Sequence, residues 1–224
     1  MSISLRKFHL TPFQIFVHLA ALAPLAALLW DMWQGNLSVN PIQDITFRTG
    51  KAAMALLVLT LAATPLHTVF GFKAGLKMRK ALGLYAFLYA SLHFLTYAWL
   101  DYDWDLHLIG LEITEKLYVL VGFAAFLILI PLAVTSTKSW QRRLKKGWKK
   151  LHRWVYPAAG LVMLHYIWVQ KADIREPIIW ASILGILLAL RLPPVRRWAV
   201  NERMKAKARY KTPPIPGKNV DSSA

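Results

Sequence analysis

Residues 151–170, LHRWVYPAAGLVMLHYIWVQ, form an apolar stretch that carries two histidines, His152 and His165, and follows a dense run of lysine and arginine. A second apolar stretch, residues 82–100, carries a single histidine, His93, near its middle. Ionisable side chains inside a membrane-spanning helix are costly and are usually functional. We therefore interpret these two stretches as membrane helices whose histidines form the functional centre of the chain.

The composition is that of an integral membrane protein. Hydrophobic residues make up 56% of the 224 residues, against about 45–50% in a typical soluble domain. They are gathered into runs long enough to cross the ~30 Å hydrocarbon core of a bilayer. The chain contains no cysteine, which excludes disulfides, iron–sulfur clusters, c-type haem attachment and thiolate zinc sites. Histidine is therefore the strongest metal ligand available.

Six apolar stretches predict an all-α integral membrane protein, a six-transmembrane helical bundle. The first stretch resembles a signal peptide because two basic residues precede it and a cleavage-like triplet lies within it. Pro24 directly after that triplet disfavours cleavage, so we interpret the stretch as a retained helix. The expected spans are residues 13–33, 52–70, 82–100, 117–134, 154–170 and 178–192.

The charges predict the orientation of this bundle. If the N-terminus, the second and fourth loops and the tail share one side, that side holds 23 of the 28 lysines and arginines but only two of the 11 acidic residues. The positive-inside rule then places both termini in the cytoplasm. The net charge of +17 follows from this orientation and from contact with anionic membrane lipid, so we predict no nucleic-acid binding.

The chain is expected to divide at about residue 198. Residues 1–198 are predicted to form the membrane domain that holds the cofactor. Residues 199–224 are basic and then rich in proline, which predicts a frayed helix followed by a disordered cytoplasmic tail. We identify no internal repeat strong enough to predict a repeated architecture.

His93 and His165 are predicted to lie at the same depth in the membrane. His93 lies 13 residues after Lys80, and His165 lies 12 residues after Arg153. At ~1.5 Å per residue, both are about 18–20 Å from the cytoplasmic edge. Two level imidazoles can bind a haem iron from both sides, which predicts a low-spin, electron-transferring haem without an open coordination position. The alternatives are buried, hydrogen-bonded histidines or a proton path.

Small residues share the predicted faces of both histidines, which leaves room for a flat macrocycle. The alternative is that they only allow the helices to pack closely. The residues are Ala86 and Ala90 beside His93, with Tyr97 one turn beyond, and Ala158 and Gly160 beside His165.

A second level is predicted nearer the cytoplasm, at Arg79 and His152. Arg79 lies 14 residues before His93, which places it within about 40° of the same helix face. His152 lies at the membrane edge, and we expect it to contact a cofactor directly. This level allows a second redox cofactor, or a contact from Arg79 to a haem propionate or a flavin phosphate.

We assign structural roles to the other histidines: His9 ahead of the first span, His18 inside it, and His67 near the end of the second. His107 belongs to the acidic outer segment 101–115. That segment is our predicted docking surface for a partner, although acidic residues are also expected on any translocated loop.

No nucleotide-binding or hydrolytic motif accompanies the histidines. The sequence has no glycine-rich phosphate loop, no HExxH motif and no defensible Ser–His–Asp arrangement. It also has no soluble domain for NAD(P)H or FAD, so the electron donor and acceptor are expected to be other molecules. The alternatives are a self-standing ferric or quinone reductase, which would need its own donor-binding domain, and a non-redox scaffold or proton-relay transporter.

Several short motifs together resemble the MsrQ family, haem-binding membrane subunits within the ferric-reductase-like transmembrane group. They extend to about residue 192, and each alone is weak. They are VHLAALAP at 17–24, NPIQDI at 40–45 with TG at 49–50, ATPL at 63–66, RKALGL at 79–84, SLHFLTY at 91–97, LAVTST at 132–137, WKKLHRWVY at 148–156 and HY at 165–166.

This resemblance implies haem b and FMN in a multi-pass protein of the bacterial inner membrane. It implies electron transfer from the quinone pool, or from a cytosolic flavin reductase, to a periplasmic molybdopterin-containing subunit that reduces methionine sulfoxide in oxidised proteins. The haem histidines of the family correspond to His93, His152 and His165. Arg79 stands where the third span of the wider group has a second histidine, which leaves the number of haems open.

Overall fold

The chain is helical throughout the part that the structure describes. A computed structural model describes residues 10–170 and 173–211 and contains no strand within those ranges. The prediction of an all-α fold is therefore confirmed for them. The helices are α1 Pro12–Gln34, α2 Pro41–Phe70, α3 Lys73–Leu95, a π-helical segment Thr96–Asp101, α4 Leu106–Glu115, α5 Leu117–Val134, α6 Lys138–Leu144, α7 Lys146–Leu151, a 3₁₀ turn His152–Trp154, α8 Val155–Val169, α9 Arg175–Ala189 and α10 Pro193–Lys211.

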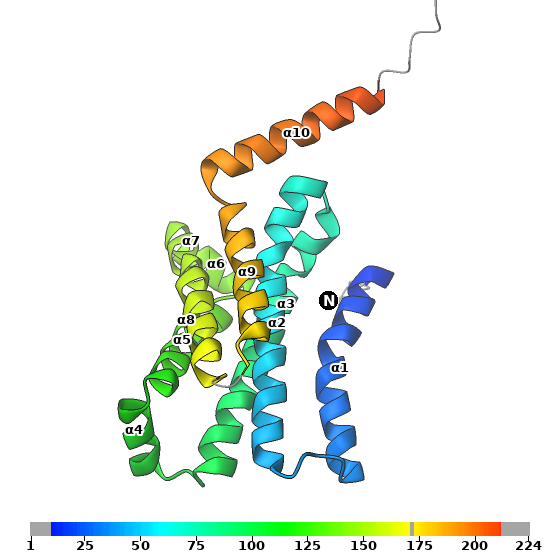
Figure 1. Cartoon of the computed structure of the whole chain (residues 1–224). Coiled ribbons are helices and arrows are strands. Elements are labelled where there is room, and N and C mark those ends of the chain that lie inside the picture. The colour runs from blue at the N-terminus through cyan, green and yellow to red at the C-terminus, as the bar shows by residue number, and fades with distance from the viewer. Residues whose placement is uncertain (1–9, 171–172, 212–224) are drawn as a thin grey trace, which may run out of the picture.

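Two helical hairpins form the body of the bundle (Figure 1). One consists of α2 and α3, and the other consists of α5 and α8, which are connected through the short helices α6 and α7. The first hairpin turns at Gly71, whose φ of 76° is a left-handed conformation that favours glycine. Because α2 also contacts α1, α9 and α10, it is the central helix of the fold.

Four described helices are long and apolar enough to cross a membrane, namely α1, α2, α5 and α3 with its π-helical extension. Helices α9 and α10 would add a fifth span as a pair, although they are bent by 79° at their junction. Helices α8 and α9 have only 15 residues each, fewer than the roughly 20 that a span needs. The structure therefore supports a helical membrane protein with four to five candidate spans, against the six that we predicted.

The connections between helices lie at the two ends of the bundle (Figure 1). The start of α1, the α2–α3 turn, the short helices α6 and α7, and α10 lie at one end. The α1–α2 connection and α4 lie at the other end. The first end therefore collects the segments that are rich in lysine and arginine, and the second collects acidic ones.

Helix α2 begins at Pro41, well before the predicted start of its span. The side chain of Asn40 caps it by accepting a hydrogen bond at 3.1 Å from a first-turn amide. Arg48 donates to Asp44 one turn earlier at 2.9 Å, and it also pairs with Asp31 at the end of α1. Arg48 is thus neutralised by one carboxylate on its own helix and by another on α1.

A buried hydroxyl fixes α1 to α3. Pro24 interrupts the hydrogen-bonding ladder of α1 because proline lacks an amide hydrogen. Tyr89, which is 1% exposed, donates its hydroxyl hydrogen to the carbonyl of Ala21 and accepts from the amide of Leu25, both at 2.9 Å. The hydroxyl therefore replaces the helical bond between these two residues and ties α1 to the α2–α3 hairpin.

Helix α10 is attached to the end of α2. Arg203 donates to the carbonyls of His67 and Thr68 at 2.9 and 3.5 Å, and such terminal carbonyls have no partner within their own helix. We expected a frayed helix beyond residue 199, but α10 continues to Lys211. The proline-rich end of the predicted disordered tail lies outside the described residues.

The acidic outer segment 101–115 is largely helical. Helix α3 runs on as the π-helical segment Thr96–Asp101, and α4 starts after Asp105, whose carboxylate accepts hydrogen bonds from two first-turn amides. Between them, Asp103 and Trp104 have φ angles of 44° and 61°. Single π-turns and non-glycine residues with positive φ are enriched near functional sites.

Candidate functional site

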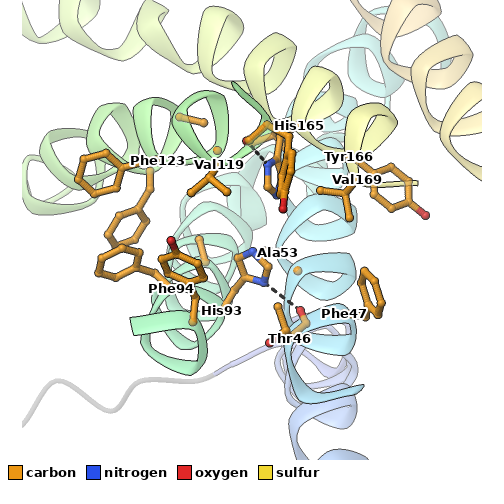
Figure 2. A pocket seen from close by; sticks show the side chains of 18 of the residues that line it. Thr46, Phe47, Ala53, His93, Phe94, Val119, Phe123, His165, Tyr166 and Val169 are labelled. Carbon is orange, nitrogen blue, oxygen red and sulfur yellow. Dashed lines mark hydrogen bonds between the residues drawn. The ribbon is translucent and has the colours of Figure 1, made fainter. Parts of the chain in front are cut away.

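A large cavity lies among α2, α3, α5 and α8, and His93 and His165 both line it (Figure 2). We call it the outer cavity. Its volume is about 600 Å³, within the ~300–1,000 Å³ that is usual for sites of small molecules and cofactors. The two hairpins of the fold each contribute one histidine to it, because His93 is on α3 and His165 is on α8.

The two imidazole rings face each other across this cavity. Their centroids are 6.1 Å apart, and their planes are inclined at 80°. Two imidazoles that bind one metal from opposite sides place their nitrogens ~4 Å apart, because each metal–nitrogen bond is about 2 Å long. Adding about 1 Å from each nitrogen to its ring centroid gives roughly 6 Å. The observed separation therefore fits a single metal held between His93 and His165.

Each ring is oriented by a backbone carbonyl. Nδ1 of His93 lies 2.9 Å from the carbonyl oxygen of Thr46, and Nδ1 of His165 lies 2.7 Å from that of Tyr118. A carbonyl can only accept, so in both rings Nδ1 carries the hydrogen and donates it. Nε2 is then the nitrogen with a free lone pair, as a metal ligand requires.

A glycine lies directly beneath each ring. A Cβ atom on Gly50 would be 3.0 Å from Nδ1 of His93, and one on Gly122 would be 2.6 Å from Nδ1 of His165. Real Cβ atoms essentially never approach as closely as 2.6 Å. The ring of His165 can therefore lie where it does only because Gly122 has no side chain, and a side chain at position 50 would displace the ring of His93 by a few tenths of an ångström.

Aromatic side chains form one wall of the outer cavity (Figure 2). The rings of Phe94 and Phe126 stack with centroids 5.0 Å apart, and Phe123 lies 5.8 Å from Phe94. The hydroxyl of Tyr97 is buried and has no hydrogen-bond partner among the described residues. A buried hydroxyl of this kind usually marks the place of a water or a ligand.

Polar residues line the outer cavity at the start of α2 and at the π-helical segment and α4. A cavity with both apolar walls and polar groups fits a flat apolar molecule with a polar edge. The polar residues are Asn40, Gln43, Lys51, Asp101, Tyr102, Glu112 and Lys116.

A second, smaller cavity lies toward the end of the bundle that carries α6 and α7. We call it the inner cavity. Its volume is about 340 Å³, and Arg79 and His152 both line it, as the predicted second level requires. Five lysines and arginines and no acidic residue occur among its lining residues, so its chemistry favours an anion. The five are Arg79, Lys80, Lys149, Arg153 and Arg191.

His152 is held by its neighbours at the edge of the inner cavity. Its Nε2 lies 3.0 Å from the hydroxyl oxygen of Thr135, and its ring stacks on Trp148 with centroids 4.0 Å apart. The structure does not bring His152 to the outer cavity.

Arg191 is the residue of the inner cavity that sequence reasoning missed. It follows α9, and it donates to the hydroxyl of Tyr156 on α8 at 2.7 Å and to the carbonyl of Leu61 on α2. Its Nε is buried and has no hydrogen-bond partner within the described part of the chain. In the sequence, Arg191 looked only like the charged end of the last span.

The remaining histidines stay apart from both cavities. His18 bonds the hydroxyl of Tyr85 at 2.9 Å, and His107 is exposed on α4. The backbone carbonyl of His67 accepts from Arg203. His9 lies outside the described residues.

The predicted roles of the small residues need correction. Ala90 and Tyr97 line the outer cavity as expected. Ala86 and Ala158, however, are 2% and 0% exposed and pack in the helix core. Gly160 would meet nothing within 4 Å of an added Cβ, so it faces open space. The residues that let the histidine rings approach a helix closely are instead Gly50 on α2 and Gly122 on α5. Neither of these two helices carries a histidine at this level.

The chemistry of the site points to a metal that brings its own ligands. Within residues 10–170 and 173–211, no group of three His, Cys, Asp or Glu side chains is placed to hold a bare metal ion. A metal bound by His93 and His165 alone would lack ligands in the plane between them. A porphyrin supplies four such ligands and fills a flat apolar cavity.

Comparison with known proteins agrees with this site. The model of the ferric reductase like transmembrane component matches residues 49–163, a segment that includes His93 and most of both hairpins. The chain belongs to the ferric reductase-like transmembrane family. No solved structure matches it.

Within the family, the chain belongs to the MsrQ branch. It is 44% identical over 207 residues to a protein of Xanthomonas campestris, covering 88% of this chain and 91% of that protein. It is 46% identical over 186 residues to a protein of Rhodospirillum rubrum, covering 82% and 89%. Both relatives are named protein-methionine-sulfoxide reductase heme-binding subunit MsrQ. The resemblance seen in the sequence motifs is thereby confirmed.

Proposed function

We propose that this chain is the membrane electron-transfer subunit of a methionine sulfoxide reductase system and that His93 and His165 hold a b-type haem between them. The observation that carries the proposal is the pair of facing imidazoles, 6.1 Å apart, each donating from Nδ1 to a carbonyl. The outer cavity of about 600 Å³ supports it, and so do the names of the relatives. When bound, the haem supplies a one-electron redox centre.

The residues around this centre explain why it transfers electrons and does not bind a substrate. With His93 and His165 both holding it, a haem iron would have no open coordination position. The two carbonyl acceptors fix the rings in one tautomer, so little reorganisation accompanies a change of charge. The aromatic wall at Phe94, Phe123 and Phe126 excludes water from the apolar part of the cavity.

The membrane topology that fits this role has six spans with both termini in the cytoplasm, in the bacterial inner membrane. The alternation of helix connections between the two ends of the bundle supports it, as does the uneven distribution of lysine and arginine. Helix α8 is lengthened by the 3₁₀ turn before it, and α9 is lengthened by the residues that lead into α10. These extensions bring both helices close to spanning length.

The inner cavity provides the second level of the electron path. His152 and Arg79 contact a further redox cofactor there, either a second haem with His152 as iron ligand or FMN. Its cationic lining suits the propionates of the former and the phosphate of the latter. Electrons enter from this cytoplasmic side, from the quinone pool or from a cytosolic flavin reductase.

The electron acceptor is a periplasmic, molybdopterin-containing methionine sulfoxide reductase subunit, which repairs oxidised proteins. It docks on the acidic segment 101–115, which lies beside the outer cavity: Asp101, Tyr102 and Glu112 belong both to this segment and to the cavity lining. The path from the outer cavity to the docked partner is therefore short.

A reduced-minus-oxidised optical spectrum with electron paramagnetic resonance of the purified protein tests the proposal. We expect b-type bands and the low-spin signal of two axial imidazoles. A complete lack of haem bands would instead favour a scaffold or a proton relay. A high-spin signal would reveal an open iron position, as a self-standing ferric reductase needs.

A further inference from the structure

The two ligand-bearing hairpins repeat the same local arrangement at a constant spacing. In the first, His93 bonds the carbonyl of Thr46 and rests on Gly50. In the second, the three corresponding residues each lie 72 positions later, at His165, Tyr118 and Gly122. The sequence gives no warning of this repeat, because the residues around the three positions differ.

Helix geometry explains why a glycine accompanies each carbonyl. In an α-helix the carbonyl of residue i points toward residue i+4, one turn further on. Gly50 is four residues after Thr46, and Gly122 is four residues after Tyr118. A ring nitrogen that reaches this carbonyl from outside the helix must pass over the i+4 position, where a side chain would stand in its way. The carbonyl has a second lone pair for this bond.

We propose that Gly50 and Gly122 are positioning residues of the cofactor site. Each lets an imidazole lie flat enough against the facing helix for Nδ1 to donate to the carbonyl one turn earlier, which turns Nε2 toward the cavity. The proposal rests on the proposed function for the identity of the bound group. It adds that the site is assembled from two equivalent halves, one in each hairpin.

The arrangement also sets the electronic character of both ligands. A neutral carbonyl acceptor keeps each imidazole neutral and makes Nε2 a better electron donor. Because both rings have the same kind of acceptor, neither axial ligand differs from the other in this respect. Loss of either Nδ1 bond weakens electron donation to a bound iron, which destabilises its oxidised form and raises its reduction potential.

The other glycines provide matched controls. Gly160 lies on α8, the helix of His165, and an added Cβ there meets nothing within 4 Å. Gly185 lies on α9, which packs against α2 and α8, and an added Cβ there also meets nothing within 4 Å. Alanine at these two positions adds the same methyl group to a helix without entering the space of a histidine ring.

The first test uses the apo-protein and does not depend on any cofactor. Nitrogen-15 nuclear magnetic resonance of labelled histidine reports which ring nitrogen carries the hydrogen and whether it is hydrogen-bonded. We expect both His93 and His165 as bonded Nδ1–H tautomers. Gly122→Ala should change the signal of His165 only, and Gly50→Ala that of His93 only. Unchanged signals in both variants would overturn the proposal.

The second test uses the protein loaded with haem. Gly122→Ala, where the contact would be 2.6 Å, is expected to lower haem affinity by about 10-fold or more. Gly50→Ala, at 3.0 Å, should retain more haem with a raised midpoint potential. The potentials of Gly160→Ala and Gly185→Ala should match the wild type. Equal potentials in all four variants would refute the positioning role even though haem is bound.

Failure of the glycine role and failure of the proposed function give different results in these tests. A wild-type protein without haem, but with the expected tautomers in the apo-protein, would sink the proposed function and leave the glycine role standing. If the wild type binds haem but Gly50→Ala, the milder of the two ring-contacting variants, leaves both the spectrum and the potential unchanged, the glycine role fails and the proposed function stands.

Discussion

His93 on α3 and His165 on α8 point their rings at each other across a cavity that neither hairpin forms alone. We expect His93→Ala and His165→Ala each to abolish haem binding, because each removes one of the two side chains that would hold the iron and leaves a hole in the cavity wall. His18→Ala is the control, since His18 bonds Tyr85 and lies outside the lining of both cavities. Haem content is measured as pyridine haemochrome per purified protein. Equal retention in all three variants would show that the ligands lie elsewhere.

Tyr89→Phe is expected to weaken the attachment of α1. The variant removes a hydroxyl that satisfies both Ala21 and Leu25, and leaving such buried groups unpaired costs about 1–3 kcal/mol. Thermal unfolding in detergent measures the loss. Tyr85→Phe, which removes only the partly buried bond to His18, should cost less. A Tyr89→Phe protein as stable as the wild type would mean that α1 restores its own ladder at Pro24.

Arg203→Ala should release α10 from the end of α2. The guanidinium donates to the carbonyl of His67, which also accepts from the amide of Gly71, and to the carbonyl of Thr68. Limited proteolysis should therefore cut the α9–α10 junction several-fold faster, while haem content stays unchanged. Arg196→Ala, an exposed change on the same helix, is the comparison. Identical cleavage rates for the two variants would contradict the capping role.

Arg191→Gln is expected to weaken ligand binding in the inner cavity and to leave binding in the outer cavity unchanged. Loss of a charged hydrogen bond of about 1.5–3 kcal/mol corresponds to roughly 10- to 100-fold weaker binding of an anionic ligand in the inner cavity. The haem between His93 and His165 should remain. The readout is the amount of flavin and haem per protein after purification. Arg196→Gln should change neither amount, and a parallel loss of all cofactor would indicate general misfolding.

The ion pair of Glu112 and Lys116 on the acidic segment 101–115 predicts that the stability of the folded protein depends on pH. The hydrogen bond from Lys116 holds the pKa of Glu112 below its usual value. A carboxyl whose pKa is lower in the folded state adds stability above its unfolded pKa, and that stability disappears as pH falls through the folded value. The melting temperature of the wild type should therefore exceed that of Glu112→Gln near neutral pH and converge with it in acid. A constant difference would contradict the assignment.

The sequence predicted those features that depend on apolar runs and matched depth. Helix α5 has the predicted bounds, because residues 117–134 are apolar with a charge before them. His93 and His165 meet as predicted, because the count of residues from the last basic residue before each apolar stretch is a local property of each helix. Their pairing across two hairpins then follows from the bundle.

The features that the sequence did not reveal depend on contacts between distant residues. In the early part of α2, Arg48 pairs with Asp31 of another helix, which no local pattern indicates. The roles of Gly50 and Gly122 appear only when a ring from 43 positions later in each case packs on them. A glycine in an apolar helix reads only as a weak helix former, so nothing local marked these two.

One ligand lies in the first hairpin and the other in the second, so the order in which the ribosome delivers the chain has a consequence. A group bound by both rings can therefore be captured only after α8 has been synthesised. A chain truncated before residue 165 has one of the two histidines and lacks this bound group.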